Sequence, residues 1–276
     1  MTQDQLSGEY VLARRVLLDA LSALGPHGDA VVLVGAQAVY LHTGNTDLAV
    51  APTTTDADIA LTPDRLHDKP LLEDALHAAG FTAGPNPGSW HGTSGVAVDL
   101  MVPESLSATG GRRGARLPIH GNRVARRTAG LEPAIVDNER RELTALDDSD
   151  GRAFTVRVAV PAALLVAKVI KVEERRSQPQ RLSAKDGLDI LRILQATETE
   201  PLARRLAELT ADPLAGAITL QAVQSLRDHG TDPDGPLATL AARAVGILAD
   251  PATIIGSQIA LIEDLLADYD RLFSGR

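Results

Sequence analysis

The spacing of apolar residues divides the chain into a mixed first part and a helical second part. Helical periodicity predicts a helix over 8–24, which Gly25-Pro26 ends, and a second over 69–79. Short apolar or β-branched runs predict strands at 30–34, 55–61, 95–102 and 154–160. Beyond residue 160 only helices are expected, over 161–176, 183–196, 200–210, 214–228, 236–248 and 251–272. We therefore expect an α/β (α+β) domain with a short mixed sheet over 1–160 and a C-terminal helical bundle over 161–276.

Two carboxylates stand two residues apart on one of these strands. Asp56 and Asp58 lie in the segment Thr-Thr-Thr-Asp-Ala-Asp-Ile-Ala-Leu (53–61). Residues i and i+2 of a strand project from the same face, so the two side chains emerge together. Mg²⁺ prefers oxygen ligands and often binds through one or two carboxylates plus substrate phosphates. The pair is a candidate Mg²⁺ site; the alternative is that both carboxylates only face water.

A third carboxylate, Asp99, follows on the strand predicted over 95–102, where it shares a face with Ala97 and Met101. If this strand pairs with 55–61, Asp99 joins Asp56 and Asp58. Two metal ions can then activate an attacking hydroxyl and stabilise a leaving pyrophosphate. Three carboxylates in this order thus indicate a phosphoryl-transfer site with one or two metal ions.

A phosphate contact is expected upstream of the carboxylates. Gly35 and Ala36 follow the buried strand 30–34 and precede a helix-compatible stretch, 36–42. A strand, a glycine turn and a helix N-terminus leave backbone N–H groups free to bind a triphosphate. The alternative is ordinary close packing at a turn.

Two groups of segments resemble known families. The segments 34–42, 54–59 and 98–100 together resemble the polymerase-β-type nucleotidyltransferase superfamily. Residues 161–168, Arg175 and 185–191 resemble the segment after the catalytic domain in AbiEii-type toxins, the nucleotidyltransferases of toxin–antitoxin pairs that include the MenT-like group. The resemblance extends to about residue 195.

The resemblance implies NMP transfer from an NTP, as co-substrate, to a hydroxyl, most concretely the 3′ end of tRNA, with Mg²⁺ and a cognate antitoxin. Modification of a small molecule such as an aminoglycoside, and a noncatalytic nucleotide- or partner-binding module, are the alternatives. The chain has Ala36 where the family often has a second glycine, and Pro52 where a basic residue is common. Ala36 keeps its backbone N–H, whereas Pro52 removes a phosphate-binding cation.

Lysine usage adds a second set of candidates. Only four of the 27 basic residues are lysines, and Lys168, Lys171 and Lys185 lie within one short stretch. Lysine offers a compact, flexible ammonium that arginine does not. We expect Lys168 to neutralise charge on phosphoryl oxygens, with Lys171 the lesser candidate. The alternative is that Lys168 extends along an apolar face with its ammonium in water.

The next helix is expected to begin near Ser183, an N-cap residue, with Asp186 in its first turn and Asp189 one turn later. The resemblance favours Asp186 as a site residue of the cleft, against a purely capping role. The predicted catalytic residues are Asp56, Asp58, Asp99, Lys168 and Asp186. The three strand carboxylates are the predicted metal ligands, and the predicted nucleotide contacts are Gly35, Ala36, Thr55, Lys171 and Lys185.

The distribution of charged residues along the chain indicates which kind of molecule could accept the NMP group. The net charge of −9 argues against an extended nonspecific nucleic-acid surface. Yet no acidic residue lies between Glu104 and Glu132, where the basic residues are Arg112, Arg113, Arg116, His120, Arg123, Arg126 and Arg127. This run can hold the phosphates of a tRNA acceptor, because arginine binds phosphate bidentately. The alternative is a solvated loop.

Three further features of the sequence limit the kinds of protein and site that are expected. The chain has no cysteine, which excludes disulfides, thiolate metal sites and a cysteine nucleophile. Its N-terminal residues show no signal pattern, and no apolar run approaches the ~18 residues of a membrane span, so we expect a cytoplasmic protein without membrane contact. We expect Trp90, the single tryptophan, to pack on a small core in a loop or hairpin rather than to stack on a base.

Overall fold

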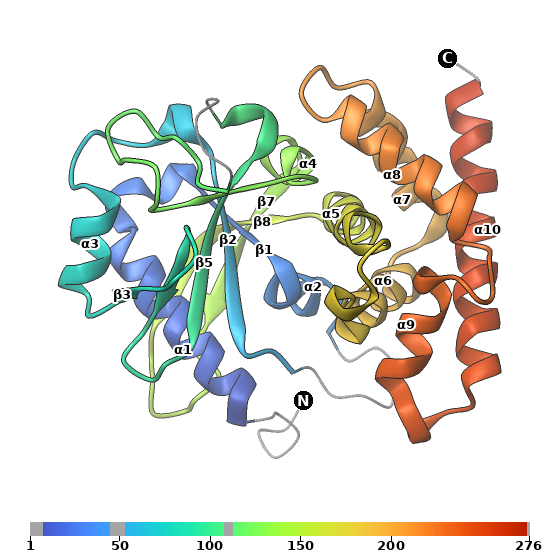
Figure 1. Ribbon diagram of the computed structural model, residues 1–276, viewed down its shortest axis with the longest axis horizontal. Helices are drawn as coiled ribbons and strands as arrows, with labels where there is room; N and C mark the ends of the chain where they lie inside the picture. Colours follow the sequence, from blue (N-terminus) through green and yellow to red (C-terminus); the bar gives the residue numbers. More distant parts are fainter. Residues whose placement is uncertain (1–7, 45–52, 108–112, 275–276) are drawn as a thin grey trace. The chain divides into compact units, whose positions relative to one another are not determined.

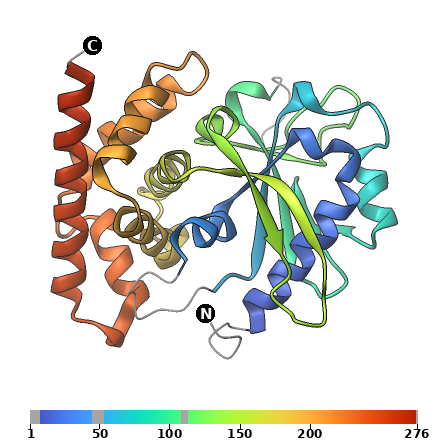
Figure 2. The ribbon, with the colours of Figure 1, turned by 180° about the vertical axis from the view of Figure 1, so that it is seen from behind.

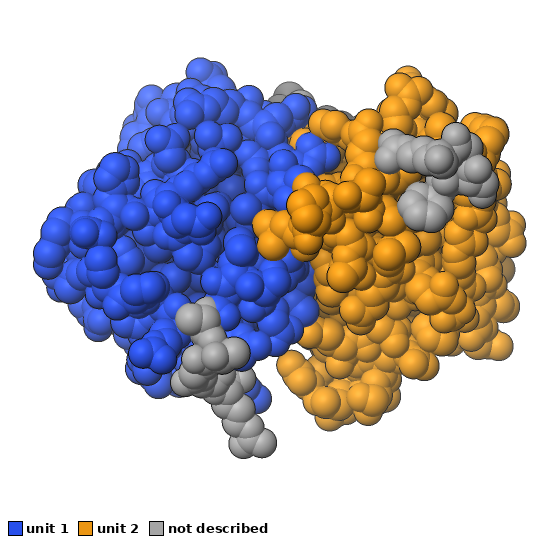
Figure 3. All heavy atoms as spheres, turned by 90° about the horizontal axis from the view of Figure 1, so that it is seen from above, with its two compact units in different colours: residues 1–38, 51–159 blue, residues 39–50, 160–276 orange. Residues whose placement is uncertain are grey.

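The computed structural model describes residues 8–44, 53–107 and 113–274. The chain separates into two compact units (Figure 3). Unit 1 comprises residues 1–38 and 51–159, and unit 2 comprises residues 39–50 and 160–276.

Unit 1 is built on an eight-stranded mixed sheet with the order β3-β4-β5-β2-β1-β8-β7, in which β6 also pairs with β5. The parallel pairs are β1–β8, β2–β5 and β5–β6, and the remaining pairs are antiparallel. The strands are β1 (Val31–Val34), β2 (Asp56–Leu61), β3 (Thr82–Ala83), β4 (Ser89–His91), β5 (Ala97–Pro103), β6 (Arg126–Thr128), β7 (Asn138–Thr144) and β8 (Ala153–Ala159). The expected mixed sheet is confirmed.

Burial follows the place of each strand in the sheet. All four residues of β1 are buried, because β1 lies between β2 and β8 at the centre of the sheet (Figure 1). In β2, buried Ala57 and Ile59 alternate with half-buried Asp56 and Asp58. The alternation arises because successive side chains of a strand point to opposite faces. The apolar set therefore enters the core while the carboxylates stay accessible.

Helices cover the sheet of unit 1. The amphipathic helix α1 (Gly8–Ala23) packs on β2 and β5 and buries Leu17 and Leu18, and η2 (Gly25–Ala30) follows it. Helix α2 (Gly35–Thr43) begins directly after β1. The other helical elements are η3 (Pro63–Arg65), α3 (Leu72–Ala78), η4 (Glu104–Leu106) and α4 (Glu132–Val136).

Every element from residue 160 onward in the described part of the chain is helical. The elements are α5 (Pro161–Arg175), η5 (Pro179–Arg181), α6 (Ala184–Ala196), α7 (Thr199–Thr210), α8 (Gly216–His229), α9 (Pro236–Val245), η6 (Gly246–Leu248) and α10 (Pro251–Ser274). Proline starts α5, α9 and α10, where its missing N–H costs no hydrogen bond. Helix α10, red in Figure 2, packs against α7 and α9.

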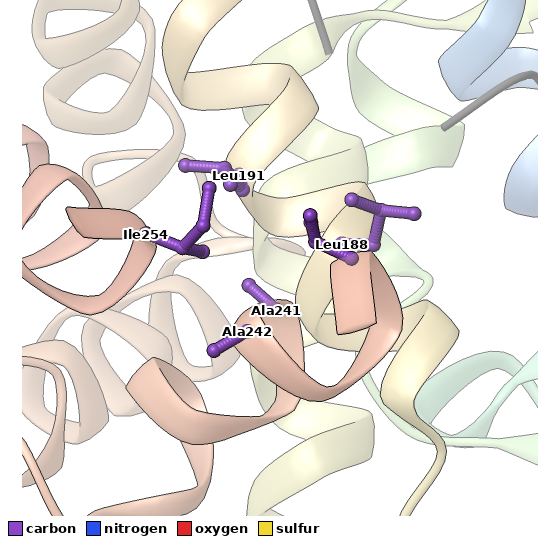
Figure 4. Close-up of a cluster of buried hydrophobic side chains, with 6 residues drawn as sticks. Leu188, Leu191, Ala241, Ala242 and Ile254 are labelled. Atoms are coloured by element: carbon purple, nitrogen blue, oxygen red, sulfur yellow. The ribbon is translucent and has the colours of Figure 1, made fainter. Parts of the chain in front are cut away.

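A small apolar cluster holds α6, α9 and α10 together (Figure 4). Its buried members are Leu188, Leu191, Ala241, Ala242, Val245 and Ile254. Helices α6 and α9 approach closely at Gly187, where a Cβ atom would lie 2.5 Å from Leu240 Cβ. Glycine at this position therefore permits the helix contact that the cluster completes.

The surroundings of Trp90 confirm its expected packing role. The residue lies in β4, its side chain is 2% exposed, and its Nε1–H donates a hydrogen bond to the carbonyl of Val124 at 2.9 Å. No helix in the described part of the chain is long and apolar enough to cross a bilayer.

Candidate active site

The three strand carboxylates lie on two neighbouring strands. In the parallel pair β2–β5, Asp58 is opposite Asp99 and Asp56 is opposite Ala97. Paired residues of adjacent strands project from the same face of a sheet, so Asp99 lies beside Asp58. The pairing expected between segments 55–61 and 95–102 is thus confirmed.

The turn after β1 lies directly against Asp58. Val34, the last residue of β1, pairs with Asp58, and Gly35 follows it with φ +69°. A Cβ atom at Gly35 would lie 2.1 Å from Asp58 Oδ2, which no real contact permits. Glycine is therefore required here both for its backbone conformation and for space. The next residue, Ala36, is buried in the first turn of α2.

Asp56 is held by a threonine that the sequence analysis did not select. Thr54 is 2% exposed, and its hydroxyl donates to Asp56 Oδ1 at 2.7 Å. Thr55, the predicted nucleotide contact, is exposed. The spacing of two between Thr54 and Asp56, on one face of an extended segment, is the signal that points to Thr54.

Asp99 is engaged by an arginine of the basic run. Arg126 Nη2 lies 3.0 Å from Asp99 Oδ2 and also contacts Met101 Sδ at 3.2 Å. Arg126 belongs to β6 and pairs with Met101 of β5, two residues beyond Asp99. A cation from far along the sequence therefore stands among the carboxylates. Sequence reasoning placed Arg126 with an RNA acceptor and missed this partner.

The rest of the basic run is ordered around β6. An antiparallel bridge joins Gly114 to Arg126, and the Arg127 N–H donates to the carbonyl of Arg113 at 2.9 Å. Arg127 itself forms an ion pair with Glu104. Three arginines of the run are exposed: Arg113, Arg116 and Arg123. Among the described residues of the run, these three carry the most exposed positive charge, while Arg126 and Arg127 are half-buried.

One member of the predicted run does not contribute surface charge. His120 is 8% exposed, and its Nδ1 accepts a hydrogen bond from the Leu72 N–H at 3.2 Å. Its Nε2 lies 3.0 Å from the His67 carbonyl. The ring therefore ties two loops together, and the expectation that it joins a positive surface is wrong. Arg112 and Pro52 lie outside the described residues.

Among the described residues of unit 1, the acidic side chains do not form a complete metal cage by themselves. Within residues 8–44, 53–107 and 113–274, no group of three or more His, Cys, Asp or Glu side chains is arranged to hold a metal ion. Asp99 is turned to Arg126 and Asp56 to Thr54. Asp56 and Asp58 remain a two-carboxylate oxygen set of the kind that Mg²⁺ shares with substrate phosphates. Both carboxylates are half-buried, and the Gly35 turn packs directly against Asp58.

The second group of predicted residues forms an ion-pair cluster within unit 2. Lys168 Nζ of α5 lies 2.9 Å from Asp186 Oδ1 and 2.6 Å from Asp189 Oδ2, both of α6. Lys171 Nζ lies 3.0 Å from Asp186 Oδ1, and Arg175 Nη1 lies 3.6 Å from Asp186 Oδ2. Three cations thus surround two carboxylates. Lys185 precedes Asp186 and is half-buried.

In this cluster, the pairing of opposite charges has a larger effect on the pKa values of Lys168 and Asp186 than burial has. Burial alone would lower the pKa of Lys168, but the charges of Asp189 and Asp186 outweigh it and hold that pKa well above its ordinary value. Burial alone would raise the pKa of Asp186, but Lys168 and Lys171 hold it well below its usual range. Lys168 and Asp186 are therefore both charged at neutral pH.

Two alternatives for these residues are wrong. The ammonium of Lys168 does not reach water along an apolar face, because its side chain is 7% exposed and paired. Ser183 occupies the N-cap position of α6, but its side chain makes no capping hydrogen bond. The carboxylate of Asp186 is used for cation pairing, so Asp186 is not merely a helix cap.

Comparison with known proteins identifies the family. A family model described as nucleotidyltransferase matches residues 14–214, which include β2, β5, β6, α5 and α6. No curated protein and no solved structure matches the chain. The match covers most of the chain and contains both groups of charged residues. The protein belongs to this nucleotidyltransferase family and is a nucleotidyltransferase.

Proposed function

We propose that the protein transfers NMP from an NTP to a hydroxyl acceptor with Mg²⁺ bound by Asp56 and Asp58. One observation carries the proposal: Asp58 stands opposite Asp99 on parallel strands while the Gly35 turn lies against its carboxylate. A rigid sheet thus presents carboxylates next to the N-terminus of α2. Nucleotidyl transfer needs this combination, because its catalysis consists mainly of positioning and charge stabilisation.

Each side chain has a defined task in this site. Asp56 and Asp58 offer carboxylate oxygens, and Thr54 orients the first of them. The backbone N–H groups at the start of α2, from Ala36 onward, are available to phosphate oxygens, since a helix N-terminus favours anions. Arg126 fixes the rotamer of Asp99. When bound, Mg²⁺ would polarise the phosphoryl oxygen and stabilise the leaving pyrophosphate.

The charged cluster of unit 2 supports a role in nucleotide binding. Lys168, Lys171 and Arg175 outnumber the two carboxylates that they contact. Lys171 has a side chain that is 40% exposed, so it offers its ammonium to an anionic ligand while Asp186 anchors it. We assign phosphate contact to Lys171, which Asp186 orients, and we assign to the buried Lys168 the role of fixing Asp186 in place.

The acceptor that we propose is the 3′ end of tRNA, modified by the protein as the toxin of a toxin–antitoxin pair. Two observations support an RNA acceptor over a cationic drug. The exposed Arg113, Arg116 and Arg123 belong to a segment bridged to β6, which pairs with the strand that carries Asp99. Their charge attracts phosphate and repels an aminoglycoside. The toxin role rests on the resemblance of segment 161–191 to AbiEii-type proteins.

The test is label transfer. Purified protein is incubated with Mg²⁺, each α-labelled NTP in turn, and either total RNA or an aminoglycoside panel. The Asp56→Asn/Asp58→Asn double variant is run beside the wild type. Asp64→Asn, which changes an exposed carboxylate of η3, is the matched control.

Label in a tRNA band that the double variant loses and Asp64→Asn keeps supports the proposal and identifies the donor. Label on a drug overturns the tRNA acceptor but keeps the metal site. Equal transfer by the double variant and the wild type would overturn the assignment of Asp56 and Asp58. Growth arrest on expression in bacteria, relieved by the double variant, tests the toxin role separately.

A further inference from the structure

The strand that carries the carboxylates is longer than its central neighbour. Strand β1 ends at Val34, which pairs with Asp58, so no β1 residue stands beside Asp56. A backbone carbonyl that loses its ladder partner in a partly buried position needs another donor. That donor is the side chain of Gln37 from α2, whose Nε2 lies 3.2 Å from the Asp56 carbonyl oxygen.

A hydrogen bond from Arg14 fixes the orientation of the Gln37 amide. Arg14 Nε donates to Gln37 Oε1 at 2.9 Å. An arginine has only donors, so the amide oxygen must face Arg14 and the NH₂ group must face Asp56. Arg14 is held in turn, because its Nη2 donates to the Tyr10 hydroxyl at 3.0 Å and its Nη1 to the Thr144 carbonyl at 2.9 Å.

The hydrogen-bond chain is shielded from solvent. Gln37 is 1% exposed, Arg14 is 2% exposed and Tyr10 is 4% exposed. Burying a guanidinium and a primary amide is unfavourable unless their hydrogen bonds are made. The Gln37–Asp56 contact is part-buried, and its donor comes from a buried, hydrogen-bonded amide that can hold the start of β2 in one position.

We propose that Gln37 is a positioning residue for nucleotidyl transfer: the Arg14–Gln37 chain fixes the backbone of Asp56 and so aims its carboxylate. The inference rests on the proposed function, because it assumes that Asp56 is a metal ligand. Groups that orient the ligands of a metal commonly change its affinity by about 10–100-fold when they are removed. The Thr54 hydroxyl donates to the Asp56 side chain at 2.7 Å and lies 3.4 Å from the Asp56 carbonyl oxygen, whereas Gln37 contacts the main chain of Asp56 and connects it to the buried Arg14.

Gln37→Glu is the decisive variant. Glutamate has the same shape and still accepts from Arg14, but it has no N–H to offer the Asp56 carbonyl. An added negative charge near Asp56 would by itself attract a cation, so weakened metal binding must come from lost positioning rather than from charge. Gln37→Met removes both hydrogen bonds, and Arg14→Lys is a milder change that keeps the positive charge.

The experiment measures Mn²⁺ binding, as a stand-in for Mg²⁺, by electron paramagnetic resonance on folded full-length protein. Each variant is first compared with the wild type by thermal unfolding. Asp58→Asn reports binding at the carboxylate pair, and Gln221→Glu, on the exposed face of α8, controls for the charge change. We expect the Kd for Mn²⁺ to rise about tenfold in Gln37→Glu and to stay unchanged in Gln221→Glu. In label transfer, the Gln37→Glu variant should lose kcat at an NTP KM close to that of the wild type.

The outcomes separate the two proposals. Absence of Mn²⁺ binding to the wild type, or binding that Asp58→Asn retains, overturns the metal site and the positioning role with it. Wild-type binding that Asp58→Asn loses, with unchanged affinity in Gln37→Glu and Gln37→Met, overturns the positioning role alone. If both Gln37 variants fail to fold, the Arg14→Lys variant provides the test. An unchanged Kd for Mn²⁺ in that variant overturns the positioning role of the Arg14–Gln37 hydrogen bonds.

Discussion

Arg126 Nη2 stands 3.0 Å from Asp99 Oδ2, and the two residues lie on the neighbouring parallel strands β6 and β5. Their side chains are 34% and 26% exposed, so the pair is accessible from solvent. One arginine of the basic run therefore holds a carboxylate of the proposed site. The third carboxylate and the basic segment are thereby linked.

Loss of this pair should impair transfer without unfolding the protein. Arg126→Gln removes the cation, so Asp99 loses its orientation beside Asp58. We expect kcat/KM to fall about 10–100-fold, measured by label transfer at saturating Mg²⁺. Arg65→Gln, at an exposed arginine of η3 outside the basic run, is the matched control. Equal activity of the two variants would show that the Arg126–Asp99 pair has no role in the reaction.

Gly35→Ala should damage the site through direct steric conflict. The new methyl group would overlap the Asp58 carboxylate, and alanine disfavours φ +69°. We expect a destabilisation of about 1–3 kcal/mol and loss of Mn²⁺ binding, measured by denaturant unfolding and by titration. Ala36→Gly, one residue later, keeps the backbone N–H and should keep metal binding. Wild-type affinity in Gly35→Ala would disprove the close packing of the turn on Asp58.

Asp186 should stabilise the fold in a pH-dependent way. Its pKa is lowered in the folded protein, so its contribution is present above the unfolded value of about 3.9 and is lost as the pH falls through the folded value. Lys168, whose pKa is raised, contributes below the unfolded value of about 10.4 and loses its contribution as the pH rises above it. Neutral pH therefore lies within the range where both groups contribute in full.

Asp186→Asn leaves Lys168 and Lys171 short of a buried partner. We expect a loss of about 3 kcal/mol in the free energy of unfolding at pH 7, and a smaller loss at pH 3. Urea unfolding followed by helical circular dichroism measures both. Asp234→Asn removes an exposed carboxylate and should have little effect at either pH. A loss for Asp186→Asn that is the same at the two pH values would contradict the ionised cluster.

His27 should make unit 1 sensitive to mild acid. Burial lowers the pKa of His27, and charge on the neighbouring His120 and His67 lowers it further. The folded state therefore favours the neutral ring, and stability is lost as the pH falls from the unfolded value of about 6.5 towards the folded value. The ring donates from Nε2 to the Pro70 carbonyl at 3.0 Å.

His27→Gln keeps a donor for the Pro70 carbonyl but does not titrate. We expect the stability of this variant to change less between pH 7 and pH 5 than that of the wild type, as measured by thermal unfolding. His229→Gln, in the last turn of α8, controls for removal of a histidine elsewhere. Parallel pH profiles for His27→Gln and the wild type would contradict the role of His27.

Local patterns predicted the elements of this protein well. Alternation placed Asp56 and Asp58 on one face of β2, and the burial of Ala57 and Ile59, which alternate with them, confirms it. The helices after residue 160 were predicted because apolar spacing and proline starts are properties of neighbouring residues. The strands β3, β4 and β6 were not delimited, since two or three residues carry little periodic signal. The edge strand β7 was also missed, because only one of its seven residues is buried and it lacks an apolar alternation.

Contacts between distant residues were harder to foresee. Gln37 meets Arg14 across 23 positions and Asp56 across 19, and Arg126 meets Asp99 across 27. Nothing in the local sequence of Gln37 marks it as a partner of a carboxylate strand. The contact arises because β1 stops two residues short of Asp56 and the helix after it brings an amide into the gap.

The amino-acid order alone thus established which residues form strands and helices and which residue types can bind a metal ion and phosphate. Tertiary structure decided which of them meet: Asp58 with Gly35, Asp99 with Arg126, and Lys168 with Asp186 and Asp189. Secondary structure depends on interactions within a few residues, whereas strand order and helix packing bring together groups that are far apart in the chain. The protonation, orientation and accessibility of each charged side chain follow from those neighbours.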